Sequence, residues 1–114
     1  MEDTTDIMSS IPPLELRAGG RIWHATAGRV WTIGRATEVD IHLDNPRVSR
    51  NHAVLEPTPA GWVLVNHSSN GIFVNGQRVD RVPIRQPTTV LVGSPSSGET
   101  LQLVPAVQPA PPPP

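Results

Sequence analysis

Apolar residues along this chain occur in short runs that turn-forming residues interrupt. Between Leu14 and Val104 the runs are rich in Val, Ile and Leu, and Gly, Pro, Asn, Asp or Ser break them about every eight to twelve positions. No segment places apolar residues at i, i+3, i+4 and i+7 for more than two helical turns. The pattern therefore predicts an all-β sandwich with almost no helix.

Ten strands follow from these runs. Ala18-Gly19-Gly20 and Asn75-Gly76 supply tight turns between neighbouring strands, because Gly and Asn adopt positive φ at low cost. We expect the strands at residues 14–17, 21–26, 30–33, 41–43, 52–56, 62–66, 72–74, 77–79, 89–92 and 100–104.

The two ends of the chain differ in composition from this central part. Residues 1–13 carry three acids around Thr4 and Thr5 and end in two prolines, which predicts a disordered acidic arm. Residues 105–114 read PAVQPAPPPP, which favours polyproline II and predicts a stiff Pro-rich linker. We therefore expect one folded domain over residues 14–104, within a longer protein.

Composition excludes several classes of function. The absence of Cys excludes disulfides, thiol catalysis and cysteine-ligated zinc. A net charge of −1 and only four aromatic residues argue against nucleic-acid binding. We expect no signal peptide and no membrane span, and hence a cytoplasmic protein. Because the net charge is close to zero, any anion is expected to bind at a local site. Residues 14–104 alone contain all nine arginines and seven acids, so this part of the chain is mildly basic.

Three loop motifs carry the candidate chemistry. They are Gly34-Arg35, Ser49-Arg50-Asn51-His52, and Ser68-Ser69-Asn70-Gly71 with Asn75-Gly76 shortly after it. Together they supply guanidinium groups, hydroxyls, a carboxamide and loop N–H groups, which are the donors that hold a tetrahedral oxyanion. Taken singly, each motif also has an ordinary structural explanation, as a solvated arginine, a loop-forming serine or a hairpin turn.

Catalysis and metal binding are less well supported. Ser49 and His52, with Asp40 or Asp44, contain the residue types of a catalytic triad, but a nucleophile and base three residues apart on one loop seldom face each other. No nucleophile elbow accompanies them. The four histidines share no metal-ligand spacing. We therefore expect a protein that is not an enzyme and that holds no metal or cofactor.

The ordered set of loop motifs resembles the forkhead-associated (FHA) domains, which bind phosphothreonine peptides. The resemblance rests on G-R, S-x-x-H starting fourteen residues after the arginine, then S-x-N-G and V-N-G, and it extends over residues 14–104. It implies a sandwich of about eleven strands with the ligand on loops at one end. An eleventh strand is accordingly expected near residues 82–84.

The resemblance also implies roles for individual residues. Arg35, Ser49 and Arg50 are expected to contact the phosphate, Ser69 to lie beside the phosphothreonine, and Asn70 to hold the ligand backbone. Gly34, His52, Gly71, Asn75 and Gly76 are expected to shape the loops. Arg47 is left open, because it could select ligand residues or pair with Asp44.

Two functions remain as alternatives. The first is a phosphothreonine-peptide binding module for phosphorylation-dependent protein–protein interaction in Ser/Thr kinase signalling, whose partner is a kinase or its substrate. The second is an FHA-like scaffold for phosphate-independent contacts through a sheet face or strand edge. The joint presence of Arg35, Ser49 and Asn70 favours the first.

The two ends suggest a context for the domain. Residues 2–6 loosely resemble the acidic double-threonine tails of small bacterial FHA regulators, which makes Thr4 and Thr5 candidate phosphoacceptors for self-association. The pattern of residues 92–103 and the Pro-rich exit resemble FHA modules at the start of bacterial ABC transporters. That context would place the domain at the cytoplasmic face of a membrane without inserting it.

Overall fold

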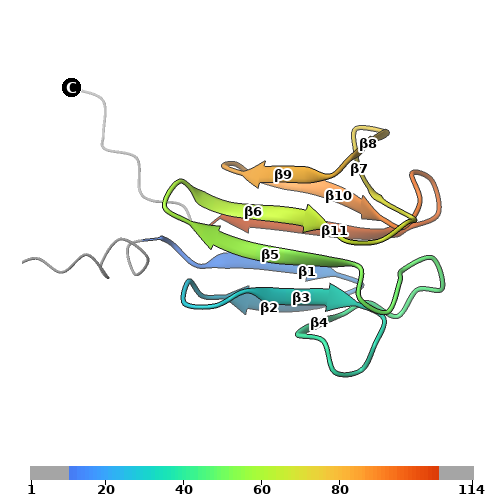
Figure 1. Ribbon diagram of the computed structural model, residues 1–114, viewed down its shortest axis with the longest axis horizontal. Helices are drawn as coiled ribbons and strands as arrows, with labels where there is room; N and C mark the ends of the chain where they lie inside the picture. The colour runs from blue at the N-terminus through green and yellow to red at the C-terminus, as the bar shows by residue number, and fades with distance from the viewer. Residues whose placement is uncertain (1–10, 106–114) are drawn as a thin grey trace, which may run out of the picture.

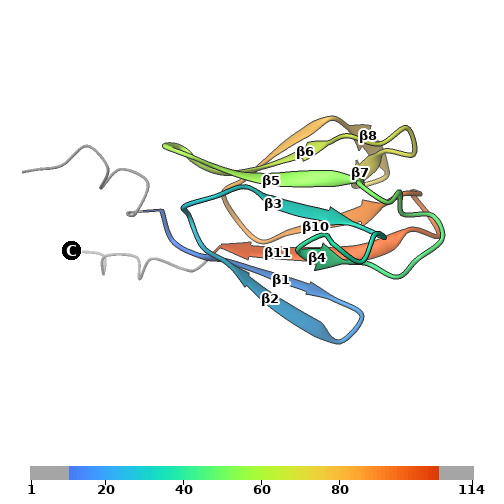
Figure 2. The same ribbon diagram turned by 60° about the horizontal axis from the view of Figure 1, so that its bottom comes forward.

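The structure, a computed structural model, describes residues 11–105 and consists of two β-sheets packed face to face (Figures 1 and 2). Eleven strands and no helix occur in this range, which confirms the predicted all-β sandwich. The strands are β1 (Leu14–Ala18), β2 (Arg21–Ala25), β3 (Trp31–Gly34), β4 (Ile41–His42), β5 (Ala53–Thr58), β6 (Gly61–Asn66), β7 (Ile72–Val74), β8 (Gln77–Val79), β9 (Arg81–Ile84), β10 (Thr88–Val92) and β11 (Glu99–Pro105).

The strand predictions agree closely with the structure. The ten expected strands are all present, and their ends differ from the expected ones by at most two residues. The eleventh strand is β9, at the position expected near residues 82–84. The periodicity did not reveal β9 because Pro83 interrupts it, and proline is tolerated here since β9 is an edge strand.

The two sheets are almost entirely antiparallel. One sheet has six strands in the order β2-β1-β11-β10-β7-β8, and the other has five in the order β4-β3-β5-β6-β9. The pair β3 and β4 is parallel. The turn between β7 and β8 is made by Asn75 and Gly76, whose φ values are +52° and +79°, as the hairpin prediction required.

Alternating side chains of the strands form the core between the sheets. In β5, Ala53 and Leu55 are buried while Val54 and Glu56 face outward, and β6 continues the alternation with Trp62 and Leu64 inside. Leu16 on β1 and Leu101 on β11 are also fully buried. Period-two burial of this kind gives each strand one possible register, because a one-residue slip would expose its whole apolar set.

Residues just before Leu14, the expected start of the domain, also contact the sandwich, and we propose that the folded domain includes them. Ile11 is only 8% exposed and packs in the core, and the indole Nε1 of Trp62 donates a hydrogen bond to the carbonyl of Pro12 at 2.8 Å. The isolated Ile11 gave no strand signal because it lies next to two prolines. The rest of the expected arm with Thr4 and Thr5, and residues 106–114 of the expected linker, lie outside the described residues.

Residues 11–105 include no helix that is long and apolar enough to cross a membrane.

The boundary at Ile11 can be tested by shortening the chain. Removal of residues 1–10 should leave the packing described here intact, whereas removal of residues 1–13 should lower the free energy of unfolding by about 2–3 kcal/mol. The loss combines the burial of one Ile side chain with a hydrogen bond to the buried indole. Urea unfolding of the two shortened chains measures the difference, and equal stabilities would contradict the assigned boundary.

Candidate functional site

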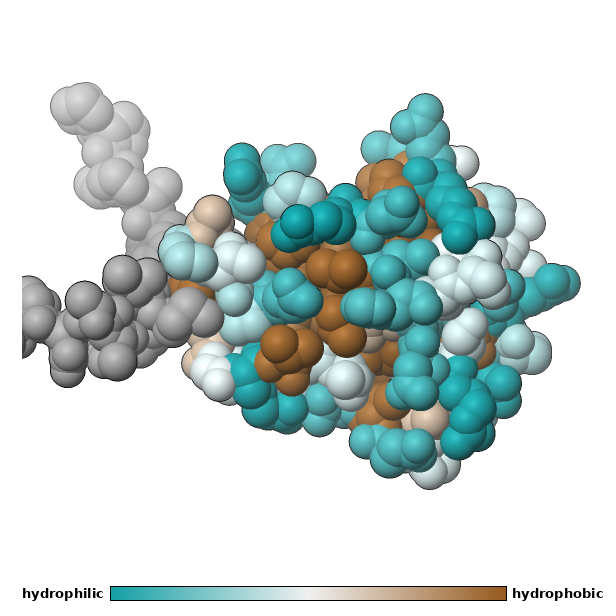
Figure 3. Space-filling view, viewed as in Figure 1, coloured by the Kyte–Doolittle hydropathy of each residue, from teal (hydrophilic) through white to brown (hydrophobic). Residues whose placement is uncertain are grey.

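Four loops gather at one end of the sandwich. They comprise residues 35–40, 43–52, 67–71 and 93–98, and they lie at the right of Figure 1, opposite the start of β1 and the end of β11. This end of the molecule is covered mainly by hydrophilic residues, as the teal and white surface in Figure 3 shows. All three sequence motifs fall in this group of loops, so the fold brings them together.

The end of β3 is joined to the loop before β5 by backbone hydrogen bonds. The amides of Arg35 and Ala36 donate to the carbonyls of Ser49 and Arg50 at 2.9 and 3.1 Å. A Cβ atom on Gly34 would lie 2.0 Å from the carbonyl oxygen of Arg50. A side chain at position 34 would therefore not fit without a shift of the Arg50 backbone, and the absence of a Cβ on Gly34 permits this close approach.

His52 connects the loops 43–52 and 67–71 through its ring. Its side chain is fully buried, and its Nδ1 accepts a hydrogen bond from the Ser49 amide at 2.9 Å. Its Nε2 lies 2.8 Å from both the Gly71 carbonyl and the Ser68 hydroxyl. Because Nδ1 must accept, the ring is the neutral tautomer with the proton on Nε2. Burial lowers the pKa of His52, although the Gly71 carbonyl opposes this by favouring the charged form.

Ser68 is a structural residue that the sequence reasoning missed. Besides the ring of His52, its hydroxyl contacts Oδ1 of Asn66 at 2.9 Å and accepts a hydrogen bond from the amide of Gly71 at 2.9 Å. The neighbouring Ser69 is exposed, and within residues 11–105 its hydroxyl has no partner. The side chain of Ser68 is directed toward His52 and Asn66, whereas that of Ser69 is exposed to solvent.

Asn70 links the third loop to the second. Its Nδ2 donates to the backbone carbonyl of Arg47 at 3.0 Å. Gly93, which the sequence reasoning also missed, donates its amide to the Gly71 carbonyl at 3.0 Å. A Cβ on Gly93 would lie 2.3 Å from the carbonyl oxygen of Arg47, so the loop after β10 is in close contact with both other loops.

Several donors at this end have no partner in the part of the chain that the structure describes. The guanidinium of Arg35 uses Nε to bind the Val48 carbonyl at 2.9 Å, which fixes the side chain and leaves its two terminal nitrogens open. The hydroxyl of Ser49 is also unpaired there. Arg50 has only a distant contact with Glu38, at 3.9 Å between exposed groups. These groups can receive an anion without first breaking a strong internal ion pair.

Arg47 has no ion pair among residues 11–105, so the structure does not show the alternative pairing with Asp44. Its side chain is exposed, while its backbone is held by Asn45, whose Oδ1 accepts the Arg47 amide at 2.8 Å. The Arg47 guanidinium is therefore without a partner in the part of the chain that the structure describes.

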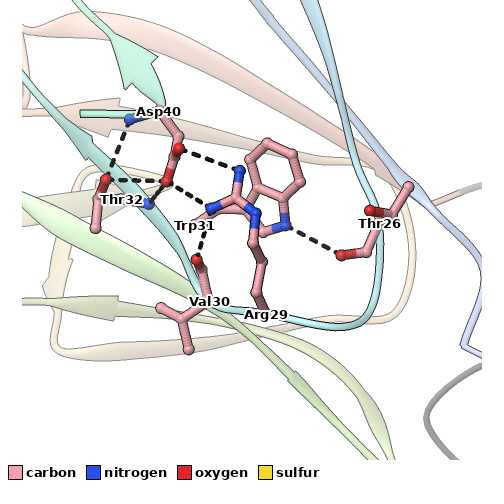
Figure 4. A network of polar contacts seen from close by, with 6 residues as sticks. All are labelled: Thr26, Arg29, Val30, Trp31, Thr32 and Asp40. Atoms are coloured by element: carbon pink, nitrogen blue, oxygen red, sulfur yellow. Dashed lines mark hydrogen bonds and ion pairs between the residues drawn. The ribbon is translucent and has the colours of Figure 1, made fainter. Parts of the chain in front are cut away.

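The arrangement does not form a catalytic triad. Both ring nitrogens of His52 are occupied by internal hydrogen bonds, so neither can act as a base for Ser49. The Asp40 carboxylate is held by Arg29, at 3.1 Å from each of two guanidinium nitrogens, and by the amide of Thr32 at 2.9 Å (Figure 4). The Arg29 guanidinium lowers the pKa of Asp40, so this carboxylate is charged and structural.

A sequence model of the FHA domain matches residues 31–93, which include all three loop motifs. The chain belongs to the FHA domain family. The match runs from Trp31, the first residue of β3, to Gly93, the residue after β10. It therefore includes the loops 35–40, 43–52 and 67–71, which carry the three motifs. Membership of this family confirms the resemblance that the motifs indicated.

One protein of Mycobacterium tuberculosis is similar to this chain both in sequence and in the structure of one of its domains. The ABC transporter ATP-binding/permease protein Rv1747 of Mycobacterium tuberculosis is 44% identical over 63 residues, which cover 54% of this chain and 7% of that protein. The chain thus spans only a small part of the curated relative. The crystal structure of the FHA-1 domain of Rv1747 has a TM-score of 0.81 and 28% identity, over 86% of this chain and 100% of that one.

A eukaryotic domain has the same fold. The N-terminal FHA domain of Rad53p from S. cerevisiae, solved in complex with a phosphothreonine peptide, has a TM-score of 0.71 at 22% identity and covers 82% of this chain and 94% of that one. This likeness shows that the two domains share the fold.

Substitution of Gly34 tests how the first two loops are joined. Gly34→Ala should lower the free energy of unfolding by about 1–3 kcal/mol or more, because the new Cβ would overlap the Arg50 carbonyl. Faster hydrogen exchange at the amides of Arg35 and Ala36 should accompany the loss. Thermal unfolding and NMR exchange measure both effects, and a variant with unchanged exchange at these two amides would contradict the close approach.

The protonation state of His52 can be tested by NMR. Near pH 6.5, the ordinary histidine pKa, most of the His52 ring should still be in the neutral Nε2–H form, because burial lowers its pKa in the folded state. Because the pKa of His52 is lower in the folded state than in the unfolded chain, the neutral ring contributes fully to the free energy of unfolding above about pH 6.5. This contribution is lost as the pH falls from there toward the folded-state pKa, since the unfolded chain takes up the proton first. Nitrogen-15 shifts report the tautomer and the titration, and a predominantly imidazolium signature for His52 at about pH 6.5 would contradict this assignment.

Proposed function

We propose that this domain binds phosphothreonine-containing peptides at the loop end, as a non-catalytic module for phosphorylation-dependent protein–protein interaction. The observation that carries the proposal is the Arg35 side chain, which is fixed through Nε while its terminal nitrogens stay open beside Ser49 and Arg50. In this proposal Arg35, Ser49 and Arg50 contact the phosphate and Ser69 lies next to it.

The phosphate group can supply most of the binding energy. A phosphothreonine carries a charge of about −1.5 to −2 and three strong acceptor oxygens. Three or four charge-assisted hydrogen bonds at about 1.5–3 kcal/mol each leave a net gain after the peptide is ordered. The side chains that would make these bonds sit on loops already joined to one another, so little further ordering of the protein is needed.

Asn70 and Arg47 extend the site beyond the phosphate. The carboxamide of Asn70 is exposed, and although Nδ2 donates to the Arg47 carbonyl, its oxygen has no partner among residues 11–105. An amide oxygen can accept from a peptide backbone N–H, which suits the proposed role of holding the ligand backbone. The exposed guanidinium of Arg47 is proposed to contact ligand residues beside the phosphothreonine.

The relatives suggest the wider setting. The similarity to part of an ABC transporter of M. tuberculosis supports a proposal that this domain acts in Ser/Thr kinase signalling and regulates an attached or partner transporter at the cytoplasmic face of a membrane. The partner would then be a kinase or one of its substrates. Phosphorylation of Thr4 or Thr5 and self-association through them stay predictions.

Peptide titration tests the proposed function. By calorimetry, a phosphothreonine peptide should bind more tightly than its phosphoserine and unmodified counterparts. Arg35→Ala should weaken binding at least about tenfold, because it removes charge-assisted hydrogen bonds to the phosphate. The matched control is Arg85→Ala, which removes the same charge near Ile11 and Trp62 at the opposite end and should leave affinity unchanged.

Comparable affinity for all three peptides would contradict phosphothreonine recognition and would favour phosphate-independent contacts. An equal effect of Arg35→Ala and Arg85→Ala would show that general charge, rather than the loop site, holds the peptide.

A further inference from the structure

Arg78 on β8 lies directly against the loop that contains Ser69 and Asn70. A Cβ atom on Gly71 would be 2.9 Å from Nε of Arg78, 3.1 Å from Cζ and 3.2 Å from Cδ. The guanidinium end of Arg78 therefore lies across the backbone of Gly71, in space that any other residue would fill. The φ of +86° at position 71 favours glycine, and the absence of a Cβ leaves room for the Arg78 side chain.

No internal partner explains the position of this arginine. Arg78 is exposed, and its side chain makes no hydrogen bond or ion pair with another residue between 11 and 105. Arg29, in contrast, has internal partners (Figure 4). It binds Asp40 through two guanidinium nitrogens, and its Cζ lies 3.7 Å from the centroid of the Trp31 ring. The five N–H donors of Arg78 are thus available to a ligand.

Arg78 is also next to the proposed ligand-holding residue. Asn70 contacts the Arg47 backbone through its side chain, and the residue that follows it, Gly71, contacts Arg78. The β7–β8 hairpin that carries Arg78 is held in place by the pairing of Phe73 with Arg78 and of Phe73 with Leu91 on β10. A peptide held by Asn70 would pass within reach of this side chain.

We propose that Arg78 forms a second anion-binding position, which receives an acidic group of the ligand on one flank of the phosphothreonine. The group is either an Asp or Glu carboxylate or a second phosphate, because both present paired oxygens that match the guanidinium fork. The proposal rests on the proposed function and narrows its ligand class to phosphothreonine peptides with a further negative charge. Since Arg78 is exposed, its contribution should weaken as salt increases.

The test compares three sets of phosphothreonine peptides. One set carries Ala at every other position, the second carries a single Glu moved one residue at a time along both flanks, and the third carries a second phosphothreonine in the same positions. At low ionic strength, Glu at one or two positions should tighten binding about three- to fivefold, and a second phosphate should tighten it more. The two peptide sets separate a carboxylate from a phosphate as the preferred group.

Substitution of Arg78 then assigns the gain to this residue. Arg78→Ala should abolish the gain from the acidic group and leave the affinity for the all-Ala phosphopeptide unchanged, whereas Arg78→Lys should retain part of it. Arg85→Ala, which removes an equal charge at the other end, should change neither affinity.

The possible failures are distinguishable. If phosphothreonine peptides bind but no acidic position improves affinity, or if Arg78→Ala keeps the gain, the proposal for Arg78 is wrong while the proposed function stands. Equal weakening of the all-Ala and acidic peptides by Arg78→Ala would likewise overturn it. If no phosphopeptide binds at all, the proposed function is wrong and this proposal is wrong with it.

Discussion

The buried imidazole of His52 is the interaction on which the loop end of this domain depends. One neutral ring accepts a hydrogen bond from the Ser49 amide and offers its Nε2–H to Gly71 and Ser68. The backbone of the same residue is also engaged, since its amide donates to Ile33 and its carbonyl accepts from His67. No apolar side chain could make these contacts, and leaving the buried partners unpaired would cost about 1–3 kcal/mol each.

This buried polar centre explains how exposed loops can be ordered without a core of their own. The loops 43–52 and 67–71 have few apolar side chains. Gly34 and Gly93 let main-chain segments approach more closely than other residues would, and Gly71 leaves room for the side chain of Arg78. The polar groups that point outward therefore start from fixed positions. In the proposed function, this order would reduce the entropy lost on binding.

The sequence predicted the strands well because each one alternates between the core and the outside, and a period of two is visible without any tertiary information. It predicted the location of the motifs, and with the family resemblance it predicted that they meet at one end. The family resemblance implied a role for Ser69 alone, and the structural role of Ser68 was missed because its hydrogen bonds depend on the direction of its side chain. The sequence reasoning also missed Arg78 and Gly93, whose contacts cross between segments that are distant along the chain.

The first and last described strands have a consequence for how the domain can be carried. Leu14 at the start of β1 is paired with Pro105 at the end of β11, so the polypeptide enters and leaves the sandwich through neighbouring positions at one pole. The loops lie at the other pole (Figure 1). A domain of this geometry can be inserted between two other segments of a protein, because the ends of those segments need to separate by only about one strand spacing. The loop end of the domain would still face away from them.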